Sequence, residues 1–248
     1  MVVLTIRKRT AGLGLILLLT LMVLGITSYT AAKHPNMDNW KTERILIDKV
    51  QTDKKVVALT FDDGPHPQFT PALLDVLKKH NAQATFFVMG NKAEAHSYIL
   101  KRTAAEGHEI GNHSYSHPNF NKLKKDAQLE EINKTTAIIQ SITGQTPTFL
   151  RPPGGYLSYD LVEMTKKQNL TIAYWTYQQD SKDWRNGRKA SVIAGHIIKN
   201  IGPGQVIILH DGCPNSMATV DAVDIILTNL KKEGYTFVTM TKLMKTGK

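Results

Sequence analysis

Two histidines and two adjacent aspartates are the residues best suited to hold a metal ion. His113 and His117 have the spacing H-x-x-x-H, which brings two imidazoles together on a helix or in a compact loop closed by Pro118. Asp62 and Asp63 follow an apolar run. A turn needs only one aspartate, so the pair indicates that one of them binds a cation. Two histidines, one carboxylate and an open position are typical of a catalytic divalent metal site.

Such a site has the chemistry of a hydrolase. The metal would polarise a carbonyl group and make water nucleophilic near neutral pH, and the second aspartate could accept the proton. Zinc suits two imidazoles and a carboxylate, and cobalt and nickel share that preference. Cys213 is the only cysteine, so the chain can form neither an intrachain disulfide nor a cysteine-rich zinc site. We expect it to be a small buried apolar residue, with a reactive thiol as the alternative.

Short apolar runs alternate with helical patterns and must position these residues. The candidate strands are residues 56–61, 85–88, 108–111, 148–150, 171–177, 206–209 and 235–239. Thr70 is predicted to cap the helix that continues through Pro71, and Gly107, Gly144 and Gly234 are predicted to end helices. This alternation predicts parallel strands, in either a barrel or a doubly wound sheet.

Polar residues follow five of the candidate strands, and this favours the barrel. They are Asp62-Asp63, Asn112-His113, Arg151, the segment from Asp180 to Trp184, and His210-Asp211. The carboxyl ends of successive barrel strands converge on one mouth, where the active sites of such barrels lie. We therefore predict an α/β fold, a distorted (β/α) barrel of about seven parallel strands with one site at its mouth.

The N-terminal residues have the pattern of an export segment. Basic residues at 7–9 precede an apolar stretch over 11–26, and small residues follow it. The uncharged run 11–32 is also long enough to span a bilayer, so a cleaved signal peptide and an anchor to the outer face of the membrane both remain open. The predicted organisation is a leader at 1–32, a linker at 33–54 and a globular domain at 55–245.

Composition and charge narrow the choice of partners. The chain is 42% hydrophobic and 21% charged, which excludes a disordered, collagen-like or coiled-coil protein. Its formal net charge is +10. It stays basic without the leader, and for an exported protein this favours an anionic cell wall or membrane surface. No motif for nucleic-acid binding is found, and nothing in the sequence indicates a protein partner.

Five ordered segments resemble the motifs of the NodB-type polysaccharide deacetylases, carbohydrate esterase family four. They are Thr60 to Pro65, His113 to His117, Arg151 to Pro153, Asp180 to Trp184 and Leu209 to Asp211. The resemblance covers residues 55–245 and implies a metal-dependent hydrolase that removes N-acetyl groups from the amino sugars of a glycan polymer. Together with the export pattern and the basic charge, it favours peptidoglycan N-acetylglucosamine. A chitooligosaccharide deacetylase, an O-acetyl xylan esterase and, from another class, a wall-binding pseudoenzyme are the alternatives.

The resemblance also implies a role for each residue of the metal site. Asp62 would be the general base, and Asp63, His113 and His117 would bind the metal. Arg151 would pair with Asp62 and keep it ionised and oriented.

A second group would complete the reaction. His210 would be the general acid, and Asp183 would raise its pKa. Trp184 would form an apolar wall of the substrate groove, with a buried core position as the alternative.

Two departures from the family pattern affect the substrate groove. The family often has a tyrosine directly after the two prolines, whereas here Gly154 and Gly155 come first and Tyr156 follows. Gly154 would still offer its backbone N–H to an oxyanion, but the tyrosine wall would be moved or lost. Ile208 stands where the family usually has leucine. We therefore expect an active enzyme with an altered groove, in which Tyr156 and Trp184 stack against sugars.

Overall fold

The computed structural model describes Thr20 and residues 37–247. The predicted leader, apart from Thr20, and the first residues of the predicted linker lie outside the described residues. The chain divides into two compact units, residues 1–39 and 40–248, and the fold below is that of the second. No helix formed by the described residues is long and apolar enough to cross a membrane.

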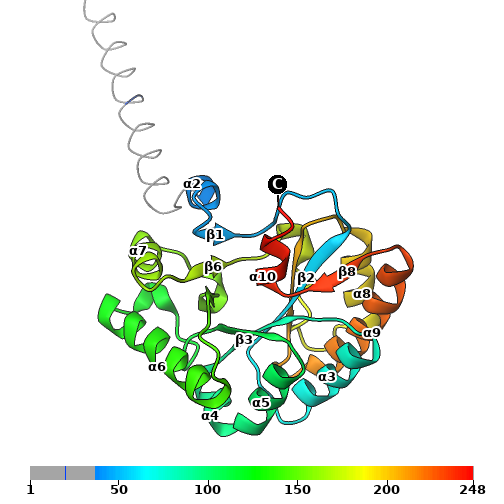
Figure 1. Ribbon diagram of the computed structural model, residues 1–248, viewed down its shortest axis with the longest axis horizontal. Coiled ribbons are helices and arrows are strands. Elements are labelled where there is room, and N and C mark those ends of the chain that lie inside the picture. The colour runs from blue at the N-terminus through cyan, green and yellow to red at the C-terminus, as the bar shows by residue number, and fades with distance from the viewer. Residues whose placement is uncertain (1–19, 21–36, 248) are drawn as a thin grey trace, which may run out of the picture. The chain divides into compact units, whose positions relative to one another are not determined.

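One sheet, whose strands all pair in parallel, forms the centre of the domain (Figure 1). Its eight strands are β1 (Leu46–Ile47), β2 (Val56–Asp62), β3 (Thr85–Val88), β4 (Glu109–Asn112), β5 (Phe149–Leu150), β6 (Thr171–Ala173), β7 (Val206–His210) and β8 (Thr236–Val238). The order is β1-β6-β5-β4-β3-β2-β7, with β8 paired to the first residues of β2. All seven predicted strands are present, and β1 is additional.

The sheet curls until the chain after β6 meets β7. The backbone N–H of Thr176 donates to the carbonyl of Val206 at 3.0 Å, and Asp180 forms a parallel bridge with Ile208. The predicted strand 171–177 is therefore shorter than expected, because after Ala173 its backbone turns toward β7. These contacts confirm the distorted barrel.

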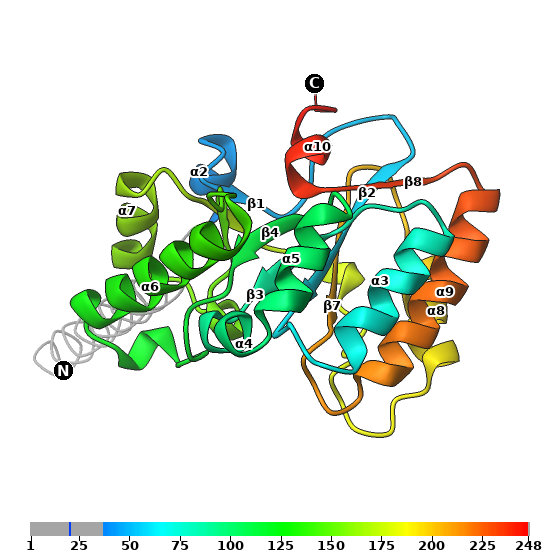
Figure 2. The same ribbon diagram turned by 60° about the horizontal axis from the view of Figure 1, so that its bottom comes forward.

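Helices cover the outside of the curled sheet. They are α3 (Phe69–Lys79), α4 (Gly90–Ala95), α5 (Ser97–Ala105), α6 (Lys125–Thr143), α7 (Tyr159–Lys167), α8 (Ala190–Lys199), α9 (Ser216–Lys232) and α10 (Met240–Met244), with α2 (Met37–Thr42) spanning the boundary between the two units. Helix α9 packs against both α3 and α8 (Figure 2). All seven residues of β2 are buried, as expected for a parallel strand with both faces covered.

The register of β2 and β7 positions the site. Asp62, the last residue of β2, is the direct partner of His210, the last residue of β7. The two residues predicted to act as base and acid are thus neighbours across paired strands. Adjacent strands lie about 4.8 Å apart in the hydrogen-bonding direction, so the backbone sets the spacing of the two side chains.

Part of the predicted linker belongs to the domain. Leu46 and Ile47 pair with Ile172 and Ala173 of β6, and both are buried. Trp40 is buried as well. The sequence did not predict this packing, because residues 33–54 are mostly polar and only a few apolar side chains among them face the core. From Trp40 onward the segment is therefore packed rather than a detached stalk.

The start of α3 differs from the prediction. Thr70 lies inside the helix, and the cap position is Gln68. The Nδ1 atom of His66 accepts hydrogen bonds from the backbone N–H groups of Gln68 and Phe69. The hydroxyl of Thr70 instead donates to Oδ2 of Asp211 at 2.5 Å. The three predicted helix-ending glycines do adopt positive φ angles.

Candidate active site

The carboxyl ends of β2, β4 and β7 open into one cleft. Its volume is about 710 Å³. The predicted site residues on its walls are Asp62, Asp63, His113, His117, Gly154, Trp184, Ile208 and His210. The structure therefore brings five distant segments of the sequence to one place, as predicted from the ends of the strands.

Asp63, His113 and His117 form a cluster that could hold a metal. Oδ1 of Asp63 lies 3.4 Å from Nε2 of His113 and 3.5 Å from Nε2 of His117. One ligand atom from each residue lies within 4.8 Å of the others. Oδ1 is buried and has no hydrogen-bond partner in the described part of the protein. A buried carboxylate oxygen without a partner, facing two imidazole nitrogens, fits a divalent cation.

The charge of Asp63 is favoured by its surroundings. Burial alone would raise the pKa of this carboxyl, but the imidazole of His113, with His210 and His117, holds it well below its usual range. The side chain therefore remains a carboxylate, which is the form that binds a metal.

A compact loop, not a helix, brings the two histidines together. Ser114 and His117 have positive φ angles of 64° and 59°. Oδ1 of Asn112 accepts from the N–H of Ser114 at 2.8 Å, and Oγ of Ser114 accepts from the N–H of His117 at 3.1 Å. Nδ1 of His113 lies 2.7 Å from the carbonyl of Arg151, and this contact leaves Nε2 for the metal.

Glu131 of α6 forms hydrogen bonds with the same loop. Its Oε2 accepts from the backbone N–H groups of Tyr115 and Ser116, each at 2.8 Å, and its Oε1 accepts from the hydroxyl of Ser116 at 2.8 Å. This residue was not predicted from the sequence, because a glutamate in a polar helix looks like any solvent-exposed residue. Its three contacts fix the chain between the two histidines.

Asp62 and Arg151 form a buried ion pair. Nη1 of Arg151 donates to Oδ1 of Asp62 at 2.7 Å, and Arg151 is fully buried. The guanidinium also donates to the hydroxyl of Thr60 and to the carbonyls of Ala173 and Tyr174. These hydrogen bonds offset part of the free-energy cost of removing the two charges from water. The predicted contact is therefore present, with Asp62 at the mouth of the barrel.

His210 and Asp183 form the second predicted pair. Nδ1 of His210 lies 2.9 Å from Oδ1 of Asp183. Burial would lower the pKa of the imidazole, but the hydrogen bond and charge of Asp183, together with Asp62 and Asp63, raise it to about 9. Because Asp183 occupies Nδ1, the other nitrogen, Nε2, is available to a substrate.

Asp183 is itself firmly held. Its Oδ2 accepts from the backbone N–H of His210 and from the hydroxyl of Thr219, both at 2.8 Å. The side-chain amide of Asn215 donates to the Asp183 carbonyl at 2.8 Å. The orientation of the His210 imidazole is thus fixed by a buried partner that has little freedom to move.

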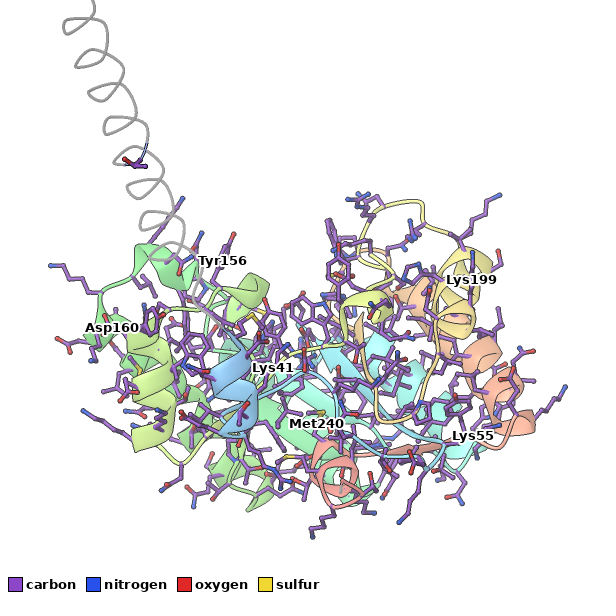
Figure 3. All side chains as sticks on the ribbon, turned by 90° about the horizontal axis from the view of Figure 1, so that it is seen from above. Lys41, Lys55, Tyr156, Asp160, Lys199 and Met240 are labelled. Carbon is purple, nitrogen blue, oxygen red and sulfur yellow. The ribbon has the colours of Figure 1, made fainter. Side chains whose placement is uncertain are left out.

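The two glycines after the prolines shape another wall of the cleft. Gly154 has a φ of 61°, and a Cβ atom there would lie 2.8 Å from the ring of Tyr156. Tyr156 thus folds over Gly154, and the tyrosine itself is not among the residues that line the cleft. In Figure 3 it lies across the domain from Lys199 of α8. The N–H of Gly154 donates to no protein acceptor among residues 37–247.

Trp175 and Cys213 line the cleft but were not predicted to do so. Trp175 stacks on Tyr174 with 4.3 Å between ring centres. From the sequence, Trp175 was assigned to the predicted strand 171–177. In the structure β6 ends at Ala173, and Trp175 lies beyond that end and lines the cleft. Sγ of Cys213 donates to Oδ2 of Asp63 at 3.2 Å. Burial and the charge of Asp63 raise the pKa of this thiol, so it stays protonated rather than becoming a reactive thiolate.

Comparison with known proteins agrees with this geometry. Residues 49–173 match the family model described as polysaccharide deacetylase. A peptidoglycan-N-acetylglucosamine deacetylase of Bacillus cereus is 43% identical over 197 residues, which are 79% of this chain and 70% of the relative.

Two solved structures are similar over most of the chain. The Bc1960 peptidoglycan N-acetylglucosamine deacetylase has a TM-score of 0.80 and 40% identity, covering 85% of this chain and 98% of its own. A family 4 acetyl xylan esterase from Clostridium thermocellum in complex with a cobalt ion has a TM-score of 0.70 and 38% identity, covering 77% and 90%.

Proposed function

The chain belongs to the polysaccharide deacetylase family, and from this premise we propose that it removes N-acetyl groups from N-acetylglucosamine in peptidoglycan with the help of one divalent metal. The observation that carries the proposal is that two supported pairs present Asp62 and His210 to the cleft that the Asp63, His113 and His117 cluster also lines. Asp62 with Arg151 can accept a proton, and His210 with Asp183 can donate one.

The metal site is proposed for Asp63, His113 and His117, and zinc is the proposed ion because imidazole and carboxylate ligands suit it. A bound divalent cation would supply Lewis acidity to the acetyl carbonyl and to the attacking water. The unpartnered Oδ1 of Asp63 supports this assignment. Cobalt and nickel share the same ligand preferences and are the alternatives to test.

The remaining chemistry would be done by residues of this chain. Asp62 takes a proton from water as the water oxygen bonds to the acetyl carbon. The backbone N–H of Gly154 donates to the oxygen that gains negative charge. Nε2 of His210 then donates a proton to the nitrogen as the carbon–nitrogen bond breaks, which releases acetate and a glucosamine amine.

The choice of substrate rests on the relatives and on charge. The similar proteins from Bacillus cereus and the Bc1960 structure are named as peptidoglycan N-acetylglucosamine deacetylases. The chain is strongly basic, which suits an anionic cell wall or membrane surface. The leader pattern in residues 1–32 supports the further proposal that the domain acts outside the membrane, either secreted or anchored to its outer face.

An O-acetyl esterase is the second candidate, because the Clostridium thermocellum relative is named as an acetyl xylan esterase. Acetate release from purified peptidoglycan, chitin pentamer and acetylated xylan should be measured side by side, together with new free amines on the glycan. The Asp62→Asn protein is the matched control. Acetate and amine appearing together on peptidoglycan support the proposal. Acetate from xylan alone indicates the esterase, and no release by the zinc-loaded protein indicates a pseudoenzyme that only binds the wall.

A further inference from the structure

Two long cationic side chains line the cleft, Lys182 and Arg185, and they differ in their partners. Nζ of Lys182 lies 2.5 Å from Oδ2 of Asp180, so its charge is already compensated. Within residues 37–247, the guanidinium of Arg185 takes part in no ion pair or hydrogen bond. Arg185 is exposed and is thus the cation of the cleft wall whose charge is available to a ligand.

Arg185 stands next to an aromatic surface. The carbon Cζ of its guanidinium lies 5.4 Å from the centre of the Trp184 ring, a cation–π distance. Trp184 also lines the cleft, and 43% of its surface is exposed. A flat apolar ring beside an uncompensated guanidinium offers two kinds of contact: the ring can cover the face of a sugar, and the guanidinium can bind an anion attached to that sugar or to its neighbour.

The segment that carries Arg185 is fixed to the reaction centre. Asp183, two residues earlier, holds the imidazole of His210. The side-chain amide of Asn215 donates to the carbonyls of both Asp183 and Arg188, at 2.8 and 3.1 Å. The backbone is therefore held on both sides of Arg185. Its side chain starts from a fixed base on the His210 side of the cleft, where the sugar ring of a substrate must lie if His210 protonates the departing amine.

The chemistry of the substrate supplies an anion that suits this position. In peptidoglycan each N-acetylglucosamine is linked to a muramic acid residue, whose lactyl ether ends in a carboxylate or continues into a peptide that carries carboxylates. Chitin has the same backbone without the lactyl group. The planar guanidinium of arginine binds carboxylates through two parallel hydrogen bonds. We propose that Arg185 binds the carboxylate of the muramyl residue beside the glucosamine that is deacetylated, and so selects peptidoglycan over neutral glycans.

The proposal for Arg185 rests on the deacetylase function proposed above, and the test separates the two. The ratio of kcat/KM for a peptide-free peptidoglycan tetrasaccharide to kcat/KM for chitotetraose should be measured for the wild-type protein and for Arg185→Gln. We expect the substitution to lower this ratio about threefold to fivefold, the upper part of the range measured for solvent-exposed ion pairs. The loss should appear in KM rather than kcat, because the contact is the same in the ground state and the transition state.

Two further variants exclude an indirect effect. Arg185→Lys keeps a point charge but loses the planar two-bond contact, so its ratio should lie between those of wild type and Arg185→Gln. Lys189→Gln removes an exposed cation that does not line the cleft, and it should leave the ratio unchanged. Raising the salt concentration to about 1 M, where the Debye length is ~3 Å, should remove most of the difference between wild type and Arg185→Gln.

The possible outcomes are distinct. A ratio that Arg185→Gln leaves unchanged for both the peptide-free and the peptide-bearing tetrasaccharide, or an equal fall caused by Lys189→Gln, overturns the role of Arg185 while leaving the deacetylase function intact. If the wild-type protein acts on neither tetrasaccharide nor on intact peptidoglycan, this result counts against the proposed function itself. A tetrasaccharide that carries stem peptides identifies the source of the carboxylate. If only that substrate responds to Arg185→Gln, the anion belongs to the peptide, and if the peptide-free substrate responds, it belongs to the lactyl group.

Discussion

Asp62 and Asp63 are neighbours in the sequence, yet both direct their side chains into the cleft. In a strand, successive side chains point to opposite faces. The strand ends at Asp62, and Asp63 has a φ of 72°, in the left-handed region that aspartate tolerates better than most residues. The change of conformation at the end of the strand lets Asp62 meet Arg151 while Asp63 meets the two histidines.

This division of roles predicts opposite effects for two substitutions. Asp62→Asn should keep the metal and lower kcat at least about a hundredfold, because it removes a general base and no ligand. His113→Ala should lower the metal content as well as the activity. Zinc measured by elemental analysis, together with acetate release, checks both results. Full activity in a sample proved free of metal would contradict the metal site.

The pair formed by His210 and Asp183 predicts a shift in pH dependence. The pKa of His210 is raised to about 9, so the protonated acid persists below that pH and is lost above it. Asp183→Asn removes the main group that raises this pKa, and the alkaline limb of kcat/KM should therefore move to lower pH. Asp62 and Asp63 also face His210 and remain, so the shift should be partial. An alkaline limb that stays in place in an active Asp183→Asn protein would rule out the assigned pairing.

The contacts of Glu131 predict an effect on metal binding. Glu131→Ala removes three hydrogen bonds from the loop between His113 and His117, and it should weaken zinc binding about tenfold, as is typical for residues that orient ligands. The measurement is a zinc titration against a chelating indicator. Glu130→Ala, at an exposed position next to it, is the matched control and should bind zinc like the wild type. Equal affinities of all three proteins would refute the role of Glu131.

The buried ion pair predicts a large loss of stability. Arg151→Ala leaves Asp62 buried without its partner, and we expect it to lower the free energy of unfolding by about 3–5 kcal/mol. Urea unfolding followed by circular dichroism measures this change. Asp62→Asn keeps an oxygen that can accept from Arg151, and it should cost clearly less. A small change in Arg151→Ala would contradict the expectation that Asp62 depends on Arg151 for its stability in the folded protein.

The exposed ring of Trp184 predicts a dependence on substrate length. If it covers a sugar in an extended groove, a chitin pentamer should be a better substrate than the monosaccharide for the wild-type protein. Trp184→Ala should lower kcat/KM for the pentamer about threefold to tenfold, as expected for the loss of one aromatic contact. The zinc content should stay unchanged. Equal rates per acetyl group on monosaccharide and pentamer would argue against an extended groove.

The residues that carry charge were the easiest to predict from the sequence. Asp62, His113, Arg151 and His210 each end a strand or directly follow one, and the convergence of parallel strand ends in a barrel made their meeting predictable. Side-chain directions in irregular segments were harder. Tyr156 turns back over Gly154 instead of lining the cleft.

Residues that act through packing or backbone contacts were missed. Trp175 was assigned to a strand that ends two residues before it. Glu131 acts on backbone groups of a distant loop, and no local pattern marks such a contact. The strand at Leu46 and Ile47 is only two residues long, too short for the alternation that identifies a strand.

The pairing of Asp62 with His210 across β2 and β7 separates the reaction from the recognition of the glycan. Base and acid are spaced by the hydrogen bonds of two buried strands, whereas Trp184 and Arg185 stand on a connecting segment. Substitutions at Trp184 and Arg185 that leave Asp183 in place can alter which polymer is accepted without changing the distance between the groups that transfer protons. Related proteins with this sheet can therefore differ in the acetylated polymer that they accept while they keep the same catalytic residues.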